Sequence, residues 1–463
     1  MSRPSLELAD IFRQHGKSYR DSHALSLEQL KPMRAIETCR TAALGGHVER
    51  CGQCQHQRIS YNSCRNRHCP KCQTLAREQW LERRKGELLP TTYYHLVFTL
   101  PPAIAELALQ NKKAIYNILF SASAETLLTI ARDPKHLGAN IGFFSILHTW
   151  GQNLRHHPHV HCVVTGGGIS QDQQRWIDSR KNFFLSVRVL SRLFRRLFLA
   201  QLAEADLKFH GQLAGLNSKA ELKRHIARTR KQDWVVYAKA PFGGPERAVE
   251  YLGRYTHKVA ITNHRLISNN NEKVSFLYKN YNSSDPQQQR VMTLDASEFI
   301  GRFLLHTIPA GFQRIRHYGL YANRNREANL KRCRQLLQAP TPSPLSAPGA
   351  AEAAIIEKAS RCPHCKLGTM LREMKLYPVR WTAKPPLDAK RHPTSRLARK
   401  LPSGSMPDHA HNTVLAGDSS VGHTREEYIA CSATLVPPVR DLIPQRIAGQ
   451  QQQSGGQIEF QSP

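Results

Sequence analysis

Apolar and polar residues alternate in a mixed strand and helix pattern between residues 91 and about 330. The segment 93–100, YYHLVFTL, is rich in β-branched and aromatic residues and is followed by two prolines, which is typical of a strand and its end. The same pattern predicts strands in HVHCVVTGG (159–167) and DWVVYAKA (233–240). Residues 186–202 place apolar side chains at helical spacing with arginines on the other face, and predict an amphipathic helix.

Three other stretches flank this region. Residues 1–90 combine a leading helical segment, a cluster of cysteines and a charged helix at 75–89. Residues 331–375 hold a basic helical segment, a linker rich in Pro, Ser and Ala, and a lone Cys-Pro-His-Cys motif. Residues 376–463 have little periodicity and many Pro, Ser, Gln and His residues, so we expect a disordered tail.

The charge of the chain narrows its range of partners. The 463 residues carry a formal net charge of +31, and the isoelectric point is about 10.0. This surplus of Lys and Arg predicts a polyanionic partner, nucleic acid first and an anionic membrane surface second. We find no run of about 18 apolar residues and no signal peptide, so we expect a cytoplasmic protein without a membrane span. In that compartment, eleven cysteines favour metal ligation over disulfides.

Two Cys-x-x-Cys pairs lie close together in the segment 51–72, CGQCQHQRISYNSCRNRHCPKC. Each pair can form a tight turn that presents two thiolates to one ion. We therefore predict one tetrahedral four-sulfur site for Zn²⁺, formed by Cys51, Cys54, Cys69 and Cys72. Such an ion could stabilise the fold alone or could also present arginines to DNA, and the spacing fits both readings equally.

Further potential ligands surround these pairs. The residues that could replace one ligand, or together support a second ion, are Cys64, His68, His56 and His47. The motif at Cys362 and Cys365 is half of a zinc site. Its missing ligands could come from Cys333, His364 or elsewhere in the chain.

The segment 148–168, HTWGQNLRHHPHVHCVVTGGG, contains a His-x-His pair on a predicted strand. Residues i and i+2 of a strand point to the same side, so His159 and His161 present two imidazoles together. Two imidazoles make an open site for a divalent cation, which a third ligand from Gln152 or His148 would complete. An open metal site can polarise a phosphate, although two surface histidines give the same pattern.

Two tyrosines recur in the segment 246–261, ERAVEYLGRYTHKVAI, which predicts a helix. Tyr251 and Tyr255 lie four residues apart on one helical face, and Lys258 follows on the same side. A tyrosine phenolate can attack phosphorus and store the bond energy as a phosphotyrosine. Tyrosines at this spacing also occur in ordinary helix packing, so the assignment depends on the metal site and the basic charge of the same chain.

Basic and aromatic residues alternate in RFLLHTIPAGFQRIRHYGLYANRNR (302–326). Aromatic rings can stack on bases while cations contact phosphates, which suits single-stranded DNA. An ordinary core helix with a solvated basic face fits the same composition. The arginines that we predict to contact DNA are Arg65, Arg67, Arg254, Arg314 and Arg316.

Taken together, these motifs resemble the HUH endonucleases, which are named for two histidines around a bulky residue. Phe98-Thr99-Leu100 looks like their first motif, HVH (159–161) like the second, and YLGRYTHK (251–258) like the third. The resemblance is closest to the two-tyrosine rolling-circle transposases of the insertion-sequence family numbered ninety-one. It covers about residues 30 to 370 and is carried by SCRNRHCPKCQ (63–73), HLVFTLP (95–101), HTWGQ (148–152), HPHVHCVVTGGG (157–168), YLGRYTHKVAITNHRL (251–266) and EFIGRFLLHTIPAGFQRIRHYGLYA (298–322).

The resemblance implies an α+β fold, in which a five-stranded antiparallel catalytic sheet with flanking helices occupies residues 91–330 after a small zinc-binding domain. It implies a bacterial, nucleoid-associated enzyme that nicks single-stranded DNA at an insertion-sequence end through a 5′-phosphotyrosine and transfers the strand by rolling-circle transposition. Mg²⁺ or Mn²⁺ is the expected catalytic ion, and Zn²⁺ the structural one. A non-catalytic zinc-dependent DNA-binding regulator, or a plasmid replication initiator or relaxase, remains an alternative. The tail after about residue 380 does not resemble the family.

Overall fold

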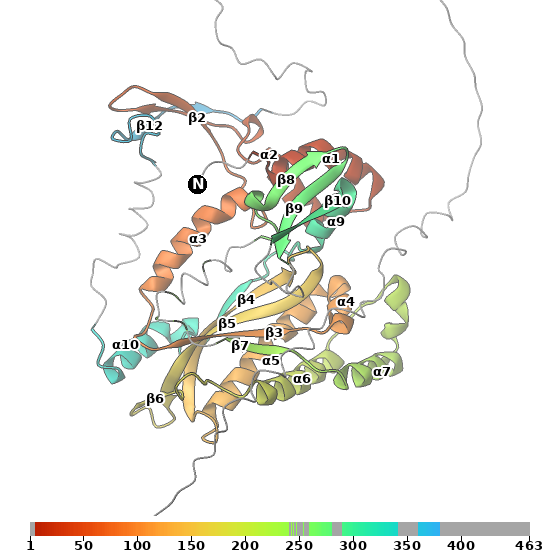
Figure 1. Ribbon diagram of the computed structural model, residues 1–463, viewed down its shortest axis with the longest axis vertical. Coiled ribbons are helices and arrows are strands. Elements are labelled where there is room, and N and C mark those ends of the chain that lie inside the picture. The colour runs from red at the N-terminus through yellow and green to blue at the C-terminus, as the bar shows by residue number, and fades with distance from the viewer. Residues whose placement is uncertain are drawn as a thin grey trace, which may run out of the picture. The chain divides into compact units, whose positions relative to one another are not determined.

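The central element is an antiparallel sheet with strand order β11-β4-β5-β3-β7, in which β6 also pairs with β5 (Figure 1). The computed structural model describes residues 5–239, 242, 244, 247, 253, 259–279, 289–340 and 360–379, with only the backbone at 74–76 and 82. The strands of this sheet are β3 (Tyr93–Thr99), β4 (Ala139–Trp150), β5 (His156–Ser170), β6 (Trp176–Asp178), β7 (Val236–Lys239) and β11 (Ile315–Gly319). The three predicted strands are confirmed as β3, β5 and β7, and the predicted α+β class with an antiparallel sheet is confirmed as well.

One face of this sheet packs on helices and forms the largest apolar core. Alternate residues of the central strands, including Phe98, Leu147 and Val160, are fully buried there. The ring of Phe98 meets that of Phe194 edge-on at a centroid distance of 5.0 Å. The elements on this face are α4 (Pro102–Gln110), α5 (Lys112–Arg132), α6 (Val187–Glu204), η2 (Gly211–Asn217) and α7 (Lys219–Arg230). The helix predicted over 186–202 is therefore confirmed as α6, and the period-2 alternation of the strands explains which side chains form the core.

Helix α5 is long and apolar enough to cross a membrane by length and composition alone. However, 67% of its apolar window is buried inside the protein. Packing against the sheet and α6 accounts for that apolar character, because both sides of the helix are in contact with the core. Among the described helices, α5 alone has this length and apolar composition, and its burial argues for a core helix.

The opposite face of the sheet is covered in part by α3 (Pro70–Lys85). Trp80 of this helix packs on Phe144 of β4, with ring centroids 5.6 Å apart. Leu81 and Phe242 join the same apolar cluster, together with Tyr93, Ile146 and Val163 from the strands. The charged helix predicted at 75–89 is thus confirmed, although it begins five residues earlier, at a proline that follows the cap residue Cys69.

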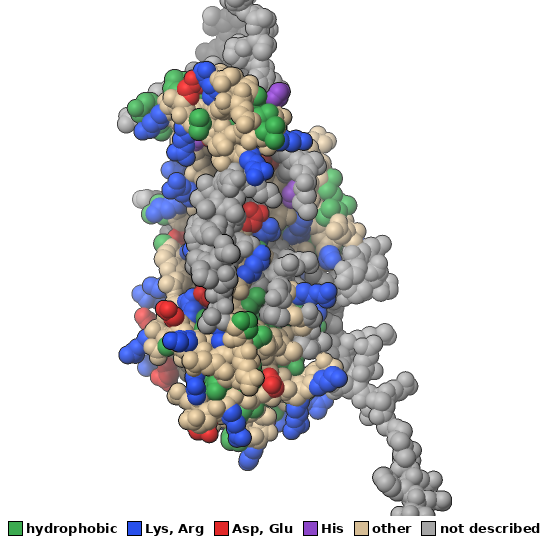
Figure 2. All heavy atoms as spheres, turned by 90° about the vertical axis from the view of Figure 1, so that its left-hand side faces the viewer, with side chains coloured by type: hydrophobic (Ala, Val, Ile, Leu, Met, Phe, Trp, Pro, Cys, Tyr) green, Lys and Arg blue, Asp and Glu red, His purple; other side chains and the backbone are tan. Residues whose placement is uncertain are grey.

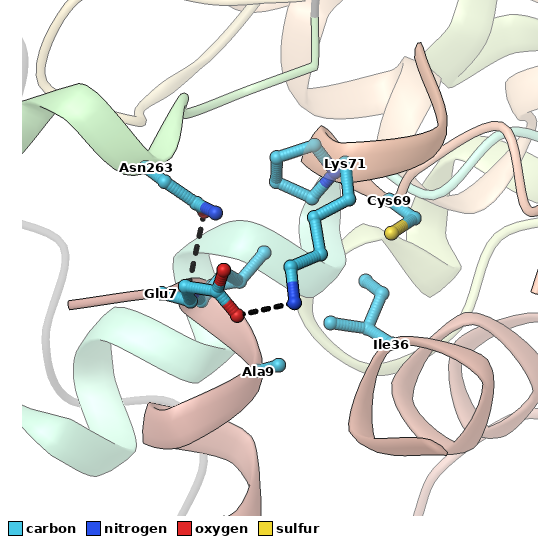
Figure 3. A pocket seen from close by; sticks show the side chains of 8 residues that line it. Glu7, Ala9, Ile36, Cys69, Lys71 and Asn263 are labelled. Carbon is cyan, nitrogen blue, oxygen red and sulfur yellow. Dashed lines mark hydrogen bonds and ion pairs between the residues drawn. The ribbon is translucent and has the colours of Figure 1, made fainter. Parts of the chain in front are cut away.

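The first two helices form a second core with a later part of the chain. Phe12 of α1 meets Phe303 of α9 edge-on at 5.4 Å. Lys71 of α3 forms an ion pair with Glu7 at 2.5 Å, and the amide of Leu8 donates to Asn263 at 3.2 Å (Figure 3). The elements of this core are α1 (Leu8–Ser22), α2 (Leu27–Thr38), η3 (Asn263–Arg265), β8 (Leu266–Asn270), β9 (Lys273–Lys279), β10 (Gln289–Asp295) and α9 (Ala296–Leu305).

A small sheet, ordered β12-β1-β2, pairs two strands from the N-terminal region with a strand near the end of the described chain. Gly46 of β1 (Gly46–Cys51) pairs with Leu376 of β12 (Met370–Leu376) on one side and with Tyr61 of β2 (Gln57–Tyr61) on the other (Figure 1). The segment around Cys362 therefore folds onto the N-terminal cysteine region. The remaining elements are η1 (Ala42–Leu44), η4 (Asn323–Asn325) and α10 (Arg326–Leu336). Apart from its first four residues, the tail predicted to be disordered lies outside the described residues.

Candidate functional site

Three histidines converge on the face of the main sheet that α3 partly covers. In the register of the strands, His148 of β4 lies directly opposite His159 of β5, and His161 is two residues further along. Side chains of paired residues point to the same side, as do residues i and i+2. One ring nitrogen from each histidine therefore falls within 4.8 Å of the others. The pair from the predicted strand is thus joined by His148, which was one of two candidates for the third ligand.

Hydrogen bonds orient the two histidines of β5. The Nδ1 of His159 lies 2.6 Å from the carbonyl oxygen of His157, which can only accept a proton, so Nδ1 is the donor. The Nδ1 of His161 lies 2.8 Å from Nε2 of His95. In both rings the contact uses Nδ1, which leaves Nε2 as the nitrogen that can bind a cation. This arrangement is typical of metal-binding histidines, whose second nitrogen is held by a neighbouring group.

His95 is a site residue that the sequence analysis did not single out. It lies on β3 opposite Val163, and its ring stacks on that of His161 at a centroid distance of 5.1 Å. Burial lowers the pKa of His95 to about 4, and the nearby Lys239 adds to this effect. The ring is therefore neutral at pH 7 and can accept a hydrogen bond. Its position four residues before Thr99, on the same face of a predicted strand, was the signal that could have found it.

The remaining candidate for a third ligand has a different environment. The backbone carbonyl of Gln152 accepts a hydrogen bond of 2.5 Å from Arg265. The ring of His148 stacks on Trp150, with centroids 4.6 Å apart, and is buried. The geometry thus brings His148 to the histidine pair, while ligation through the side-chain amide of Gln152 stays a prediction.

The predicted nucleophiles Tyr251 and Tyr255 lie outside the described residues, as do Lys258 and Arg254. Gly253 is described and has helical backbone. A Cβ added at Gly253 would lie 2.5 Å from a methyl carbon of Leu81, so a larger residue would require this side chain of α3 to shift. Leu81 belongs to the apolar cluster on the histidine-bearing face of the sheet, which brings this point of the tyrosine segment to the same side.

The cysteines form two separate clusters, which corrects the prediction of one site from Cys51, Cys54, Cys69 and Cys72. In the first cluster, the sulfurs of Cys39 and Cys64 each lie 3.6 Å from that of Cys72, and those of Cys39 and Cys69 are also 3.6 Å apart. The other predicted pair, at residues 51 and 54, belongs to a second cluster. The prediction was wrong because β1 and β2 carry the first pair away from the start of α3.

The first cluster is built from three local turns. Cys69 caps α3, whose positive end favours a thiolate. Cys39 and Cys64 are each followed by an arginine with positive φ, 57° at Arg40 and 52° at Arg65. The sequence prediction missed Cys39, because the same Cys-Arg dipeptide also occurs at Cys333, which belongs to neither cluster. Four sulfurs at these separations fit a tetrahedral zinc ion, and all four lie within the N-terminal region.

The second cluster joins Cys51 and Cys54 to the Cys-x-x-Cys motif near the end of the described chain. The sulfurs of Cys51 and Cys365 are 3.7 Å apart, as are those of Cys54 and Cys362. The amides of Gly368 and then Leu367 lower the pKa of Cys365 to about 6, which favours the thiolate that metals bind. The lone motif is therefore completed by cysteines from elsewhere in the chain.

The histidines proposed as extra zinc ligands have other partners. The Nε2 of His68 accepts a hydrogen bond of 3.1 Å from the amide of Ile308, and zinc ligation by His68 stays a prediction. Burial lowers the pKa of His68 to about 3. His47 lies 2.8 Å from Glu49, and His56 stacks on His364 at 5.3 Å. Cys333 is buried on α10 in another apolar cluster.

The arginines predicted to contact DNA differ in their exposure and in the contacts that they make within the protein. Arg65 is exposed beside the first cysteine cluster. Arg67 donates to the carbonyl of Phe312 at 2.7 Å, and Arg316 donates to Asn117 at 2.5 Å while its guanidinium lies over the ring of Phe120. Burial lowers the pKa of Arg314 to about 10, and Arg67 contributes. Lys and Arg side chains are spread over the described part of one face (Figure 2). DNA contact by these arginines stays a prediction.

The antiparallel sheet, its histidine cluster and the cysteine-rich N-terminal region define an α+β protein with a zinc-binding region. A family model described as "Transposase zinc-binding domain" matches residues 11–100, and one described as "Putative transposase" matches residues 142–329. The chain therefore belongs to the IS91 family of transposases, and its partner is DNA.

Two relatives agree with this assignment. The chain is 55% identical over 382 residues to "Putative transposase y4qJ" of Sinorhizobium fredii (strain NBRC 101917 / NGR234). The matched residues make up 80% of this chain and 96% of that protein. It is 31% identical over 323 residues to "Transposase for insertion sequence element IS801" of Pseudomonas savastanoi pv. phaseolicola, covering 68% and 76% of the two chains. No solved structure matches.

Proposed function

We propose that this transposase nicks single-stranded DNA at the end of its insertion sequence and transfers the strand by rolling-circle transposition. The observation that supports this proposal most directly is the convergence of His148, His159 and His161, whose ring nitrogens lie within 4.8 Å of one another. A cluster of neutral donors on one face of a sheet is suited to a cation that also binds phosphate oxygens. The basic character of the chain suits the same substrate.

The donor set fits a divalent transition-metal ion. Imidazole nitrogens bind Mn²⁺ more readily than Mg²⁺, which prefers oxygen ligands and retains its water. We therefore propose Mn²⁺ as the better fit of the two expected ions. When bound, such an ion would polarise a phosphate oxygen and leave coordination positions for DNA. His148, His159 and His161 would hold the ion, and His95 would hold the ring of His161 in place.

The proposed nucleophiles are Tyr251 and Tyr255. A phenolate oxygen would attack the phosphorus, the bond to the 3′ oxygen would break, and the released 3′ end would take a proton from solvent. The product is a 5′-phosphotyrosine, and a second tyrosine would allow two strands to be held in succession. Gly253, which lies between the two tyrosines in the sequence, lies against Leu81 of α3. Lys258 would help to orient the phosphate.

Zinc in the first cysteine cluster would have a structural role beside this site. Four sulfurs with contacts of 3.6 Å leave no open position for a substrate, which is typical of structural zinc. We propose Cys39, Cys64, Cys69 and Cys72 as its ligands. Arg65, which follows Cys64, would then be presented to the DNA backbone, and binding to chromosomal DNA would place the protein at the nucleoid.

The test is a covalent-adduct assay. A labelled single-stranded oligonucleotide that carries the end of the element is incubated with the full chain and Mn²⁺ or Mg²⁺, and the mixture is run on a denaturing gel. We expect a protein–DNA adduct with the wild type. The double variant Tyr251→Phe and Tyr255→Phe should lose the adduct while it still binds the oligonucleotide, because phenylalanine keeps the ring but removes the nucleophilic oxygen.

A matched control is Tyr377→Phe, which removes the hydroxyl of an exposed tyrosine, 73% accessible, on the segment after β12. This variant should form the adduct at the wild-type level. An adduct that persists in the double variant would show that the nucleophiles are wrongly assigned. No adduct with the wild type, under conditions where the oligonucleotide is bound, would favour a DNA-binding protein without this chemistry.

A further inference from the structure

The second cysteine cluster unites residues that lie far apart in the chain. Cys54 and Cys362 are separated by 308 positions, and Cys51 and Cys365 by 314, yet the sulfurs of each pair are 3.7 Å apart. We propose that Cys51, Cys54, Cys362 and Cys365 bind a second Zn²⁺, in addition to the ion of the first cluster. The family model for the zinc-binding domain ends at residue 100, so half of this ligand set lies outside it.

The sulfur separations fit a zinc ion rather than disulfides. A tetrahedral ion with Zn–S bonds of about 2.3 Å places its sulfurs about 3.8 Å apart. A disulfide would bring two sulfurs to about 2.05 Å. The contacts of 3.7 Å match the first distance, and the four sulfurs all lie within 4.8 Å of one another. Four cysteines in this arrangement form a closed set, as expected for a structural ion.

The two halves of the site have the same local geometry. After each pair, the next residue adopts a left-handed backbone conformation, with φ of 56° at Gln55 and 61° at Lys366. The amide of Gln55 donates to the carbonyl of Cys51 at 3.2 Å, and that of Lys366 to the carbonyl of Cys362 at 2.9 Å. Neither residue is glycine, so two similar tight turns form at a conformational cost that a shared ligand would offset.

Backbone amides point at the sulfurs in both turns. The amides of Gln53 and Cys54 donate to the sulfur of Cys51 at 3.4 Å, and the amide of Gly368 donates to that of Cys365 at 3.3 Å. Such donors stabilise a thiolate, the form in which cysteine binds zinc. The turns are therefore arranged for charged sulfurs and not merely for buried thiols.

Gly368, in the second half of the site, lies very close to the sulfur of Cys51 in the first half. A Cβ added to this residue would lie 2.5 Å from the sulfur of Cys51, well inside van der Waals contact. Its carbonyl also accepts a hydrogen bond of 2.7 Å from the amide of Cys362. Any side chain at position 368 would thus displace the sulfur of Cys51, which provides a way to disturb the site without removing a ligand.

The small sheet beside the cluster has little apolar core of its own. The apolar cluster there consists of Cys51, Cys362 and Met370, with Cys365 packed against it. Ile59, Leu371 and Met374 are exposed by 55%, 59% and 56%. Small units that cannot bury enough apolar surface often depend on a metal for folding. A zinc ion at this point would link the segment of β1 to that of β12 and so constrain the long stretch of chain between them.

Zinc content of the full-length protein tests the proposal. The protein is purified under reducing conditions, and zinc per chain is measured by inductively coupled plasma mass spectrometry. The double variant Cys362→Ser and Cys365→Ser should contain one zinc ion fewer than the wild type. Cys333→Ser, which changes a buried cysteine outside both clusters, should retain the wild-type content. An ion at the histidine cluster would contribute equally to all three proteins and cannot mimic this difference.

Three further measurements keep the test independent of how well the double variant folds. The variant Gly368→Ala should weaken retention of one zinc ion against a chelator, and hydrogen exchange should show loss of protection in β12 (Met370–Leu376). X-ray absorption of the wild-type protein should show zinc in an all-sulfur environment. An unchanged zinc content in the double variant, or disulfides at these four cysteines in freshly purified reduced protein, would overturn the proposal. Neither result would affect the proposed DNA cleavage, because the histidine site does not use these residues.

Discussion

The hydrogen bond from His161 to His95 allows a sharp test of the histidine site. If Nε2 of His161 binds the cation, its Nδ1 must carry the proton and donate to Nε2 of His95, 2.8 Å away. The variant His95→Phe keeps an aromatic ring stacked on His161 but removes the acceptor. His161 would then either keep a buried donor without this partner or change tautomer and lose Nε2 as a ligand. Both outcomes should weaken metal binding.

The size of the effect follows from the burial of this pair. His95 is 3% exposed and His161 is 7% exposed, so water replaces the lost acceptor poorly. Leaving a buried donor unsatisfied costs about 1–3 kcal/mol. Loss of a group that orients a metal-binding histidine typically lowers metal affinity about 10- to 100-fold, which is about 1.4–2.7 kcal/mol. The two ranges agree, so we expect His95→Phe to raise the dissociation constant for Mn²⁺ by one to two orders of magnitude.

Electron paramagnetic resonance of free Mn²⁺, titrated with protein, measures this constant directly. The matched variant is His95→Gln, whose amide oxygen can accept the proton from His161 and should restore much of the affinity. Circular dichroism and thermal unfolding establish that both variants are folded. Equal Mn²⁺ affinity in wild type and folded His95→Phe would refute the role of His95. Equal losses in the Phe and Gln variants would indicate a packing role instead of a hydrogen-bonding one.

Two predictions concern the stability of the scaffold. Burial lowers the pKa of His306 to about 4, so the unfolded chain, with a pKa near 6.5, binds a proton that the folded chain does not. Stability should therefore fall as the pH falls through this window, and between pH 7 and 5 the variant His306→Gln should lose about 2 kcal/mol less than the wild type in urea unfolding. If the His306→Gln variant lost as much unfolding free energy between pH 7 and 5 as the wild type does, this prediction would be contradicted. Gly319 has φ of 58°, and an added Cβ would lie 1.9 Å from the carbonyl oxygen of Ile141. Gly319→Ala should thus destabilise the fold by more than Gly311→Ala, which has φ of 71° and open space and should cost about 1–2 kcal/mol. Equal unfolding free energies for the two would argue against the clash.

The elements of the main sheet could be predicted because their signal is local. The segments YYHLVFTL and HVHCVVTGG are rich in apolar, β-branched and aromatic residues, as expected of strands whose two faces are both covered, and they lie in β3 (Tyr93–Thr99) and β5 (His156–Ser170). The small sheet was harder to anticipate. β12 reads MLREMKL, and its pairing with β1 depends on contacts across more than 300 residues that no local pattern encodes.

The sequence by itself determined which chemistry the chain can carry: two imidazoles on one side of a strand, thiolates in Cys-x-x-Cys turns, and a large positive charge. The spacing of residues within a strand or a turn decides which side chains point to the same side, and the rest of the fold does not change this. Only the tertiary structure decided the partners. Pairing of β4 with β5 supplied His148, and that of β3 with β5 supplied His95. The closure of the small sheet separated two cysteine pairs that are neighbours in sequence and joined one of them to Cys362 and Cys365, because a ligand set is completed by whichever side chains the fold brings within a few ångströms.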